Sequence, residues 1–326
     1  MIRARVIGTG AYLPERRLTN QELERMVETS DRWIIERTGI RERRIAAPEE
    51  ATSDLAAAAG RQALAASGVA ASSVELIIVA TATPDMLFPS TACLVQDRLG
   101  AKQAFAFDLS AACTGFLYAL AVADQYIRAG TYRTILVIGA EVLSRMIDWT
   151  DRSTCILFGD GAGAVVLQAD QGARGLLSTH LHSDGALWDL IHIPGGGSRR
   201  PPSVETLANR MNFVKMKGSE TFRVAVRALE EVAREALTAN GLTPEELTLI
   251  IPHQANLRIL QAVAERLAVP EGKVVINVDR YGNTSAASIP IALDEAVRGG
   301  RIKPDDLLLL EAFGAGLTWG AALMRW

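Results

Sequence analysis

Short aliphatic runs alternate along the chain with longer segments whose apolar side chains recur at helical spacing. The short runs predict strands, and they cover residues 75–80, 134–139, 164–167, 274–277 and 307–310. The longer segments predict helices, and they cover residues 52–67, 116–129, 220–240 and 257–267. This alternation is typical of an α/β protein in which helices cover the sheets.

The two halves of the chain contain similar segments. Residues 76–80 resemble residues 249–253, and each run follows a helical segment and an acidic turn. Residues 158–167 resemble residues 313–323 in their Gly-rich start and apolar end. We therefore expect a diverged internal repeat, with a boundary near residues 170–175.

Composition narrows the class of protein. A chain of 326 residues forms either two ordinary domains or one large α/β unit. Hydrophobic residues make up 49% of the chain and aromatic residues only 6%, which favours a large aliphatic core. The net charge of −3 gives no reason to expect binding to nucleic acid or to an anionic membrane surface. No apolar stretch reaches the ~18 residues that span a bilayer.

The cysteines and the first residues of the chain indicate the cellular compartment. Three cysteines, with no paired spacing, argue against a disulfide framework and favour a reducing compartment. The first residues run directly into a predicted strand, without the long apolar core or the cleavage site of a signal peptide. We expect a soluble, cytoplasmic protein.

Cys113 is the main candidate for chemistry. The apolar run 104–109 predicts a short buried strand, small residues follow it, and helical spacing begins at Gly115. Cys113 thus stands at a strand-to-helix elbow, close to the first turn of a helix. The positive end of a helix lowers the pKa of a thiol and favours the nucleophilic thiolate. A lone Cys is more often a small buried hydrophobe, so this candidate needs support from elsewhere.

His253 and Asn283 supply that support. His253 follows the predicted strand 249–252, and Asn283 follows a turn at Gly282 and precedes a run of small residues. Alone, each residue has an ordinary structural explanation. Together, Cys113, His253 and Asn283 are each delivered by a strand-to-helix turn, so we expect them to meet in one pocket.

The chain resembles the β-ketoacyl-acyl carrier protein synthase III family, the condensing enzymes that initiate bacterial fatty acid synthesis. The resemblance runs from about Val6 to Trp326, and it depends on several motifs in one order: residues 31–43, 111–115, 158–163, 253–256, 280–288 and 311–320. It implies a thiolase-like fold, in which two duplicated α/β halves, 1–172 and 173–326, form five α-β-α-β-α layers. The first half carries the Cys, and the second carries the His and the Asn.

The resemblance also implies two half-reactions. Cys113 takes the acyl group of an acyl-CoA, and malonyl-acyl carrier protein then loses carbon dioxide and attacks the acyl-Cys. His253 and Asn283 donate hydrogen bonds to the enolate oxygen. The N–H of Ala315 joins that of Cys113 in an oxyanion hole, and Phe313 borders the site and disfavours the malonyl carboxylate. Relatives often have a third glycine in place of Ala315.

The family's binding residues match several positions here. Trp33 and Arg152 correspond to the pair that sandwiches the CoA adenine, with Arg37 near the phosphates. The basic positions expected to bind the acidic carrier protein are Arg223, Arg258 and Arg266. Glu265 stands where relatives often have a second basic residue. For these arginines, a solvated helix face is the alternative.

Phe88 bears on assembly and on the primer. By resemblance it crosses a homodimer interface and closes the acyl pocket of the partner subunit. An apolar loop that covers only its own subunit is the alternative. The sequence does not determine which acyl group serves as the primer. Acetyl, propionyl and short branched acyl groups differ by one to three carbons, and a pocket discriminates between them by only about 1–3 kcal/mol per methylene. We expect acetyl-CoA, and we expect no cofactor.

The remaining motifs have ordinary explanations. Cys93, in a helical run, and Cys155, in a strand-like run, are expected to pack in the core, which argues against a thiolase with two catalytic cysteines. His180 and His182 alternate on a likely strand, but no further metal ligands stand at credible spacing. The Gly-rich residues 159–163 precede a strand, whereas a dinucleotide-binding loop opens a helix. The loop 194–203 is either a lid or interface element or a simple surface excursion.

Two other functions stay open. A secondary-metabolite condensing or acyl-transfer enzyme of the same fold would use another primer, and such relatives often lose the Asn or alter the Gly-Asn-Thr-Ser run, which is intact at residues 282–285. A non-catalytic subunit that binds acyl-CoA predicts a replaced nucleophile, whereas Cys113 is present. Fatty acid initiation is the function we expect.

Overall fold

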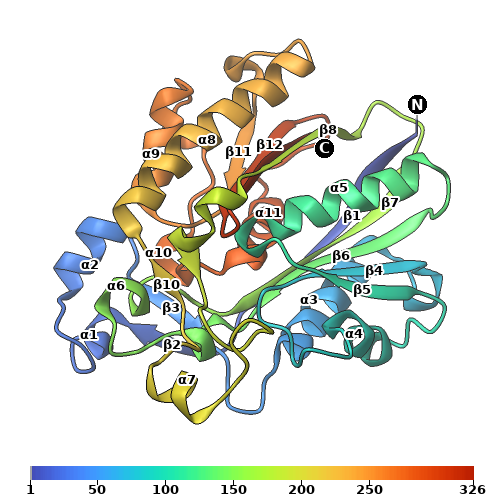
Figure 1. Ribbon diagram of the computed structural model, residues 1–326. Coiled ribbons are helices and arrows are strands. Elements are labelled where there is room, and N and C mark those ends of the chain that lie inside the picture. The colour runs from blue at the N-terminus through green and yellow to red at the C-terminus, as the bar shows by residue number, and fades with distance from the viewer. Residues whose placement is uncertain (1) are drawn as a thin grey trace.

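A computed structural model describes residues 2–326 of the chain and contains two large sheets (Figure 1). The first sheet has five strands in the order β1-β7-β6-β4-β5. Its strands are β1 (Arg3–Tyr12), β4 (Leu76–Ala80), β5 (Phe105–Leu109), β6 (Thr134–Glu141) and β7 (Gly161–Asp170). Every residue of the central strands β4 and β6 is buried, which explains their continuous apolar sequence.

The second sheet has four strands in the order β11-β12-β13-β8. Its strands are β8 (Gly175–Ser183), β11 (Leu249–Pro252), β12 (Leu307–Gly314) and β13 (Thr318–Arg325). The pair β11–β12 is parallel, and Pro252 is in register with Glu311. The C-terminal end of β11 therefore delivers His253 beside the C-terminal half of β12.

Five layers result from the way the helices cover the two sheets. Helices α5 (Gly115–Arg128) and α11 (Ser288–Arg298) lie between the sheets and contact strands of both. Helices α3 (Thr52–Ser67) and α4 (Thr91–Leu99) cover the outer face of the first sheet, and α8 (Gly218–Ala239), with α9 (Leu257–Arg266) packed on it, covers the second. The predicted α-β-α-β-α thiolase-like fold is confirmed.

Shorter elements connect the strands and helices of the layers. They include the hairpin β2 (Arg16–Thr19) and β3 (Glu42–Ile45), the pair β9 (Ile191–His192) and β10 (Lys215–Met216), and the helices α1 (Asn20–Leu23), α2 (Asp31–Thr38), α6 (Arg152–Cys155), α7 (Val204–Ala208) and α10 (Val278–Tyr281). Single 3-10 turns include η2 (Ala112–Thr114) and η7 (Ser285–Ala287). These two turns contact each other, and η2 leads directly into α5 while η7 leads directly into α11.

Three local predictions were wrong. Residues 274–277 form no strand, because only Val274 makes an isolated bridge, to Ile250. The strand at 104–109 is present as β5, but it lies at the edge of its sheet and is partly exposed rather than buried. Cys155 ends the short helix α6 instead of beginning a strand, although it is buried as expected.

All strands of the first sheet come before residue 171 in the sequence, and all strands of the second sheet come after residue 174. The division into halves 1–172 and 173–326 stays a proposal that this arrangement supports. Residues 193–203 have no regular structure and lead into α7, so the role of this loop also stays a prediction. None of the helices within residues 2–326 has the length and apolar character needed to cross a membrane.

Candidate active site

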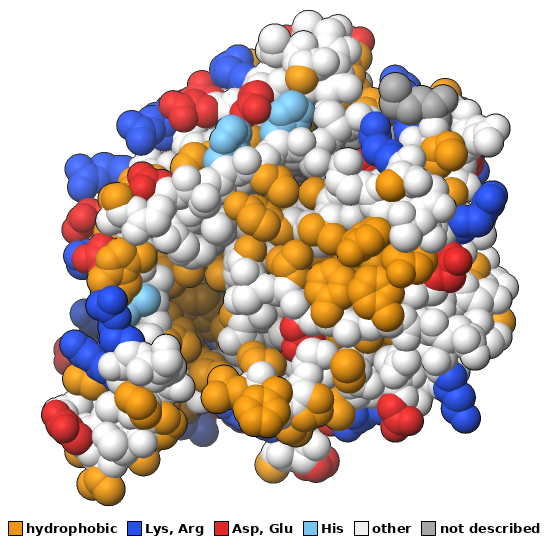
Figure 2. All heavy atoms as spheres, turned by 45° about the vertical axis from the view of Figure 1, so that its right-hand side comes forward, with side chains coloured by type: hydrophobic (Ala, Val, Ile, Leu, Met, Phe, Trp, Pro, Cys, Tyr) orange, Lys and Arg blue, Asp and Glu red, His pale blue; other side chains and the backbone are white. Residues whose placement is uncertain are grey.

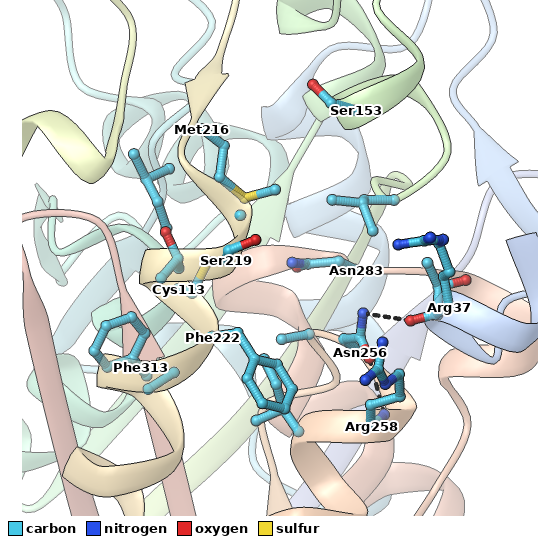
Figure 3. A pocket seen from close by; sticks show the side chains of 18 of the residues that line it. Arg37, Cys113, Ser153, Met216, Ser219, Phe222, Asn256, Arg258, Asn283 and Phe313 are labelled. Carbon is cyan, nitrogen blue, oxygen red and sulfur yellow. Dashed lines mark hydrogen bonds between the residues drawn. The ribbon is translucent and has the colours of Figure 1, made fainter.

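A cavity of about 560 Å³ opens among α2, α6, α8 and α9, and it brings the three predicted residues together. Cys113, His253 and Asn283 all line it, although they come from three distant parts of the chain. Figure 3 shows Cys113 and Phe313 on one side of this space, with Arg37 and Arg258 on the other. Most of the lining is apolar, so charges that develop inside are poorly screened by water.

Cys113 lies in η2, directly before α5. Although the residue is in part exposed to the cavity, burial raises the pKa of its thiol to about 12. Burial outweighs the neighbouring Ser285 hydroxyl, which lowers this pKa, and the effect of the helix end on the thiol stays a prediction. The thiol is therefore neutral at rest.

The loop that carries Cys113 is tied to the end of the second sheet. The Thr318 hydroxyl lies 3.1 Å from the carbonyl oxygen of Ala111 and 3.2 Å from that of Ala315. The backbone of Gly314 passes so close that a Cβ there would stand 2.8 Å from the nitrogen of Cys113. This close approach requires glycine and places the β12–β13 turn, with Ala315, beside Cys113.

His253 is fixed where β11 ends. Its backbone N–H donates to the carbonyl oxygen of Glu311 at 2.7 Å, and the next N–H, of Gln254, donates to the Ser288 hydroxyl at 2.7 Å. Burial lowers the pKa of the imidazole to about 3. A neutral imidazole has one N–H, so His253 can donate one hydrogen bond into the cavity without carrying a charge.

Hydrogen bonds with the backbone hold Asn283 in place. The Ser285 N–H donates to its side-chain oxygen at 2.9 Å, which leaves the amide N–H₂ group as the free end. Its backbone N–H donates to Leu157 O at 2.8 Å, and the Gly159 N–H donates to its carbonyl oxygen at 3.0 Å. These bonds hold a neutral donor at a fixed place, as expected for a residue that stabilises an oxyanion.

Trp33 and two arginines form the mouth of the cavity. The guanidinium carbons of Arg37 and Arg152 each lie 4.8 Å from the centre of the Trp33 ring. Trp33 and Arg37 line the cavity, and Arg152 lies next to Ser153, which also lines it. Flat aromatic and guanidinium groups in contact are suited to stack on a third flat group such as a purine.

The three arginines expected to bind the carrier protein do not form one cluster. Arg223 and Arg258 line the cavity, and Arg258 lies over the ring of Phe222 at 5.7 Å. Arg266 lies at the other end of α9, where it pairs with Glu230 at 2.8 Å. Only the first two arginines therefore border the entrance.

Comparisons with known proteins identify the family of the chain. The family described as 3-oxoacyl-[acyl-carrier-protein (ACP)] synthase III matches residues 107–185, and its C-terminal part matches residues 237–326. A β-ketoacyl-[acyl-carrier-protein] synthase III from Rhodospirillum centenum is 57% identical over 329 residues, which cover 100% of this chain and 99% of that protein. The chain belongs to the synthase III family.

Solved structures of synthase III proteins and their relatives have the same fold. The crystal structure of the 3-oxoacyl-[acyl-carrier-protein] synthase III from Aquifex aeolicus superposes with a TM-score of 0.93 and 51% identity, covering 99% of this chain and 100% of that one. A priming β-ketosynthase of a polyketide biosynthetic pathway superposes with a TM-score of 0.91 and 37% identity, covering 99% and 96%. Synthase III proteins are condensing enzymes of the acyltransferase type, so the prediction of an enzyme is confirmed.

Phe88 has a different setting from the rest of the predicted synthase III site. Phe88 is 83% exposed and its neighbour Leu87 is 87% exposed. Figure 2 shows a deep hollow lined by hydrophobic side chains, with further hydrophobic side chains gathered on the same face of the molecule. A single subunit thus leaves this apolar loop uncovered, and its role stays a proposal.

The other candidate residues of this synthase III chain are placed elsewhere. The prediction that Cys93 packs in the core was wrong: its neighbours Ala92 and Val95 face inward from α4, and Cys93 faces outward. His180 and His182 share the carboxylate of Glu235, at 3.0 and 2.7 Å. Within residues 2–326, no group of three or more His, Cys, Asp or Glu side chains is placed to hold a metal ion.

Two polar residues near Cys113 were missed by the sequence analysis. Ser285 lowers the pKa of the Cys113 thiol against the effect of burial, and its hydroxyl donates to the buried carboxylate of Glu141 at 3.0 Å. The one signal in the sequence is an acidic residue that ends an otherwise apolar strand, at Glu141. Such a residue is unusual in a fully buried strand, but nothing in the sequence links it to Cys113.

Proposed function

We propose that this chain initiates type II fatty acid synthesis. It condenses a short acyl-CoA, acetyl-CoA in the first instance, with malonyl-acyl carrier protein and releases a 3-oxoacyl-acyl carrier protein. The observation that carries the proposal is the meeting of Cys113, His253 and Asn283 in one apolar cavity with Trp33 and Arg37 at its mouth. Two half-reactions follow from these groups.

In the first half-reaction, the Cys113 sulfur attacks the thioester carbon of the acyl-CoA. The carbonyl oxygen gains negative charge, and the N–H groups of Cys113 and Ala315 stabilise it. The closeness of the β12–β13 turn to Cys113 supports this role for Ala315. CoA leaves as the thiol, and the acyl group stays on Cys113.

In the second half-reaction, the malonyl group loses carbon dioxide and the resulting enolate attacks the acyl-Cys113 carbon. The bond from this carbon to the Cys113 sulfur then breaks, and the sulfur leaves as the thiolate. His253 and Asn283 are both neutral donors, so they stabilise the enolate oxygen without attracting the malonyl carboxylate as a salt-bridge partner. The lowered pKa of His253 and the bound oxygen of Asn283 support this assignment. The buried ring of Phe313 lines the cavity and disfavours a carboxylate there, which favours its loss.

The two carriers enter from the same side. Trp33, Arg37 and Arg152 bind the adenine and phosphates of CoA, because they offer flat faces and positive charge at the mouth. Arg223 and Arg258 border the entrance and bind the acidic carrier protein. Arg266, paired with Glu230 at the far end of α9, contributes less than the sequence suggested.

A homodimer explains the exposed apolar surface. Strand β5 forms the edge of its sheet, its aromatic residue Phe105 is 39% exposed, and the loop with Leu87 and Phe88 is almost fully exposed. Exposed apolar edges are usually covered, and a two-fold symmetric pairing covers both copies at once. Phe88 of each subunit would then close the acyl pocket of the other. The three free cysteines support a cytoplasmic location.

The primer is tested with purified protein, malonyl-acyl carrier protein and a series of acyl-CoAs from acetyl to octanoyl. We expect 3-oxoacyl-acyl carrier protein with the highest kcat/KM for acetyl-CoA or another short primer. Product formed only with long primers, or only with a carrier protein from a secondary pathway, would contradict the proposal. It would favour the priming role that the similarity to the polyketide β-ketosynthase suggests.

A further inference from the structure

The side-chain amide of Asn283 has an orientation that one backbone group imposes. Its oxygen accepts from the Ser285 N–H at 2.9 Å. An N–H group can only donate, so the amide oxygen must face Ser285 and the amide N–H₂ group must point elsewhere. Hydrogen bonds with Leu157 and Gly159 hold the backbone of Asn283, but they do not select between the two ends of its amide. The place of the Ser285 N–H therefore decides whether Asn283 offers a donor or an acceptor to the cavity.

Ser285 has an unfavourable backbone conformation. Its φ is 48°, in the left-handed region that residues other than glycine rarely adopt. Such a conformation persists only where the surrounding structure maintains it. The turn η7, which Ser285 begins, packs on β6 so closely that a Cβ added at Gly139 would clash with the carbonyl oxygen of Ala286. Strand β6 is thus the element that supports this turn.

Glu141, at the end of β6, holds the side chain of Ser285. Glu141 is fully buried, and its Oε1 accepts from the Ser285 hydroxyl at 3.0 Å. The carboxylate is itself held by the segment that follows β4. The Thr83 hydroxyl donates to Oε2 at 2.7 Å, the Ala82 N–H at 3.1 Å and the Thr81 hydroxyl at 3.3 Å. These bonds leave the carboxylate little freedom to turn, so it is a rigid anchor for the Ser285 hydroxyl.

We propose that Glu141 and Ser285 are positioning residues for Asn283. Glu141 maintains the turn at Ser285, and the Ser285 N–H directs the amide N–H₂ group of Asn283 toward the enolate oxygen. The proposal rests on the proposed function, in which Asn283 stabilises that oxygen. Without the bond to Glu141, the turn relaxes toward negative φ and its N–H leaves Asn283. The amide can then rotate and present its oxygen, which repels an enolate.

A positioning role of the Ser285 hydroxyl differs from a chemical one. A hydroxyl that takes part in the chemistry is lost equally in Ser285→Ala and Ser285→Gly. A hydroxyl that only maintains the turn is dispensable in Ser285→Gly, because glycine adopts positive φ without strain. In the same way, Glu141→Gln keeps an oxygen that can accept from Ser285, whereas Glu141→Ala does not.

The experiment starts from protein acetylated at Cys113, as verified by its intact mass, so that any effect of Ser285 on the thiol does not enter. Malonyl-acyl carrier protein is added over a range of concentrations, and the release of carbon dioxide is followed in a single turnover. The variants are Ser285→Ala, Ser285→Gly, Glu141→Ala and Glu141→Gln. Thr81→Val is the matched control, because it removes another donor to the same carboxylate and leaves the bond from Ser285 in place.

Ser285→Ala and Glu141→Ala should lower the saturating rate of carbon dioxide release about tenfold. The half-saturating concentration of the malonyl carrier should stay within about twofold, because orientation and not binding is lost. Ser285→Gly, Glu141→Gln and Thr81→Val should stay within about threefold of the wild-type rate. In protein that already carries Asn283→Ala, adding Ser285→Ala should slow the reaction no further, since no amide is left to orient.

Equal slowing in Ser285→Gly and Ser285→Ala would overturn the inference, because the hydroxyl itself would then be needed. A wild-type rate in Ser285→Ala would also overturn it, as would a further tenfold loss when Ser285→Ala is added to Asn283→Ala. A wild-type rate in Asn283→Ala is a different result: it would remove the role of Asn283 in the proposed function. If the Glu141 variants unfold, the comparison of Ser285→Ala with Ser285→Gly decides the question.

Discussion

Adding one methyl group at Gly314 tests whether the position of Cys113 depends on the β12–β13 turn. A Cβ at this position would stand 2.8 Å from Cys113 N, 3.1 Å from Cys113 Cβ and 3.1 Å from Thr114 N. Ordinary contacts lie at about 3.5 Å or more, so the two segments must separate by roughly 0.7 Å. Backbone atoms line this contact, and a backbone gives way only by moving the Cys113 loop.

A shift of this size in Gly314→Ala is expected to slow acylation of Cys113 by about tenfold to a hundredfold, because near-attack geometry tolerates little displacement. Overpacking should lower the free energy of unfolding by about 1–3 kcal/mol. Acylation is measured by release of CoA in a single turnover, and stability by thermal unfolding. Gly272→Ala, where a Cβ meets nothing within 4 Å, is the control. A folded Gly314→Ala protein that acylates within twofold of the wild type would refute this reasoning.

Three further predictions concern other parts of the site. Asn283→Asp should slow decarboxylation of malonyl-acyl carrier protein by about 10²–10³-fold, measured as release of carbon dioxide, because a carboxylate cannot donate to the enolate; an unchanged rate would contradict its role. Trp33→Ala should raise the KM for acetyl-CoA about three- to thirtyfold and leave the KM for the malonyl carrier unchanged; equal changes in both would indicate a general distortion. Burial raises the pKa of Glu311 from 4.5 to about 8, so the folded protein keeps a proton that the unfolded chain releases, and stability should fall as the pH rises through this interval. In Glu311→Gln the melting temperature should no longer fall because of this group between pH 4.5 and about 8. The same fall in Glu311→Gln as in the wild type would show that burial does not raise the pKa of Glu311.

Much of the architecture could be predicted from the sequence because each central element has a strong pattern. Helix α3 matches the predicted range, and α8 and α9 differ from it by one or two residues. The weaker patterns failed for physical reasons. Residues 274–277 are apolar enough for a strand, but only Val274 finds a partner. Strand β5 is apolar because it is a sheet edge that, as we propose, a second subunit covers.

The site was predictable only in part. The three elbows carry recognisable residues, so Cys113, His253 and Asn283 could be placed in one pocket from the sequence. The pKa of Cys113 could not be predicted, because it depends on how completely the fold removes water from the thiol. The contact between Ser285 and Glu141 joins residues 144 positions apart, and its existence depends on the packing of η7 against β6.

The most direct test of the central claim is the mass of the intact protein after incubation with acetyl-CoA and then with malonyl-acyl carrier protein. The account predicts one acetyl adduct, mapped to Cys113 and absent in Cys113→Ala, which disappears when the malonyl carrier is added and 3-oxobutanoyl-acyl carrier protein forms. An adduct on another residue, or an adduct that the malonyl carrier does not discharge, would contradict it.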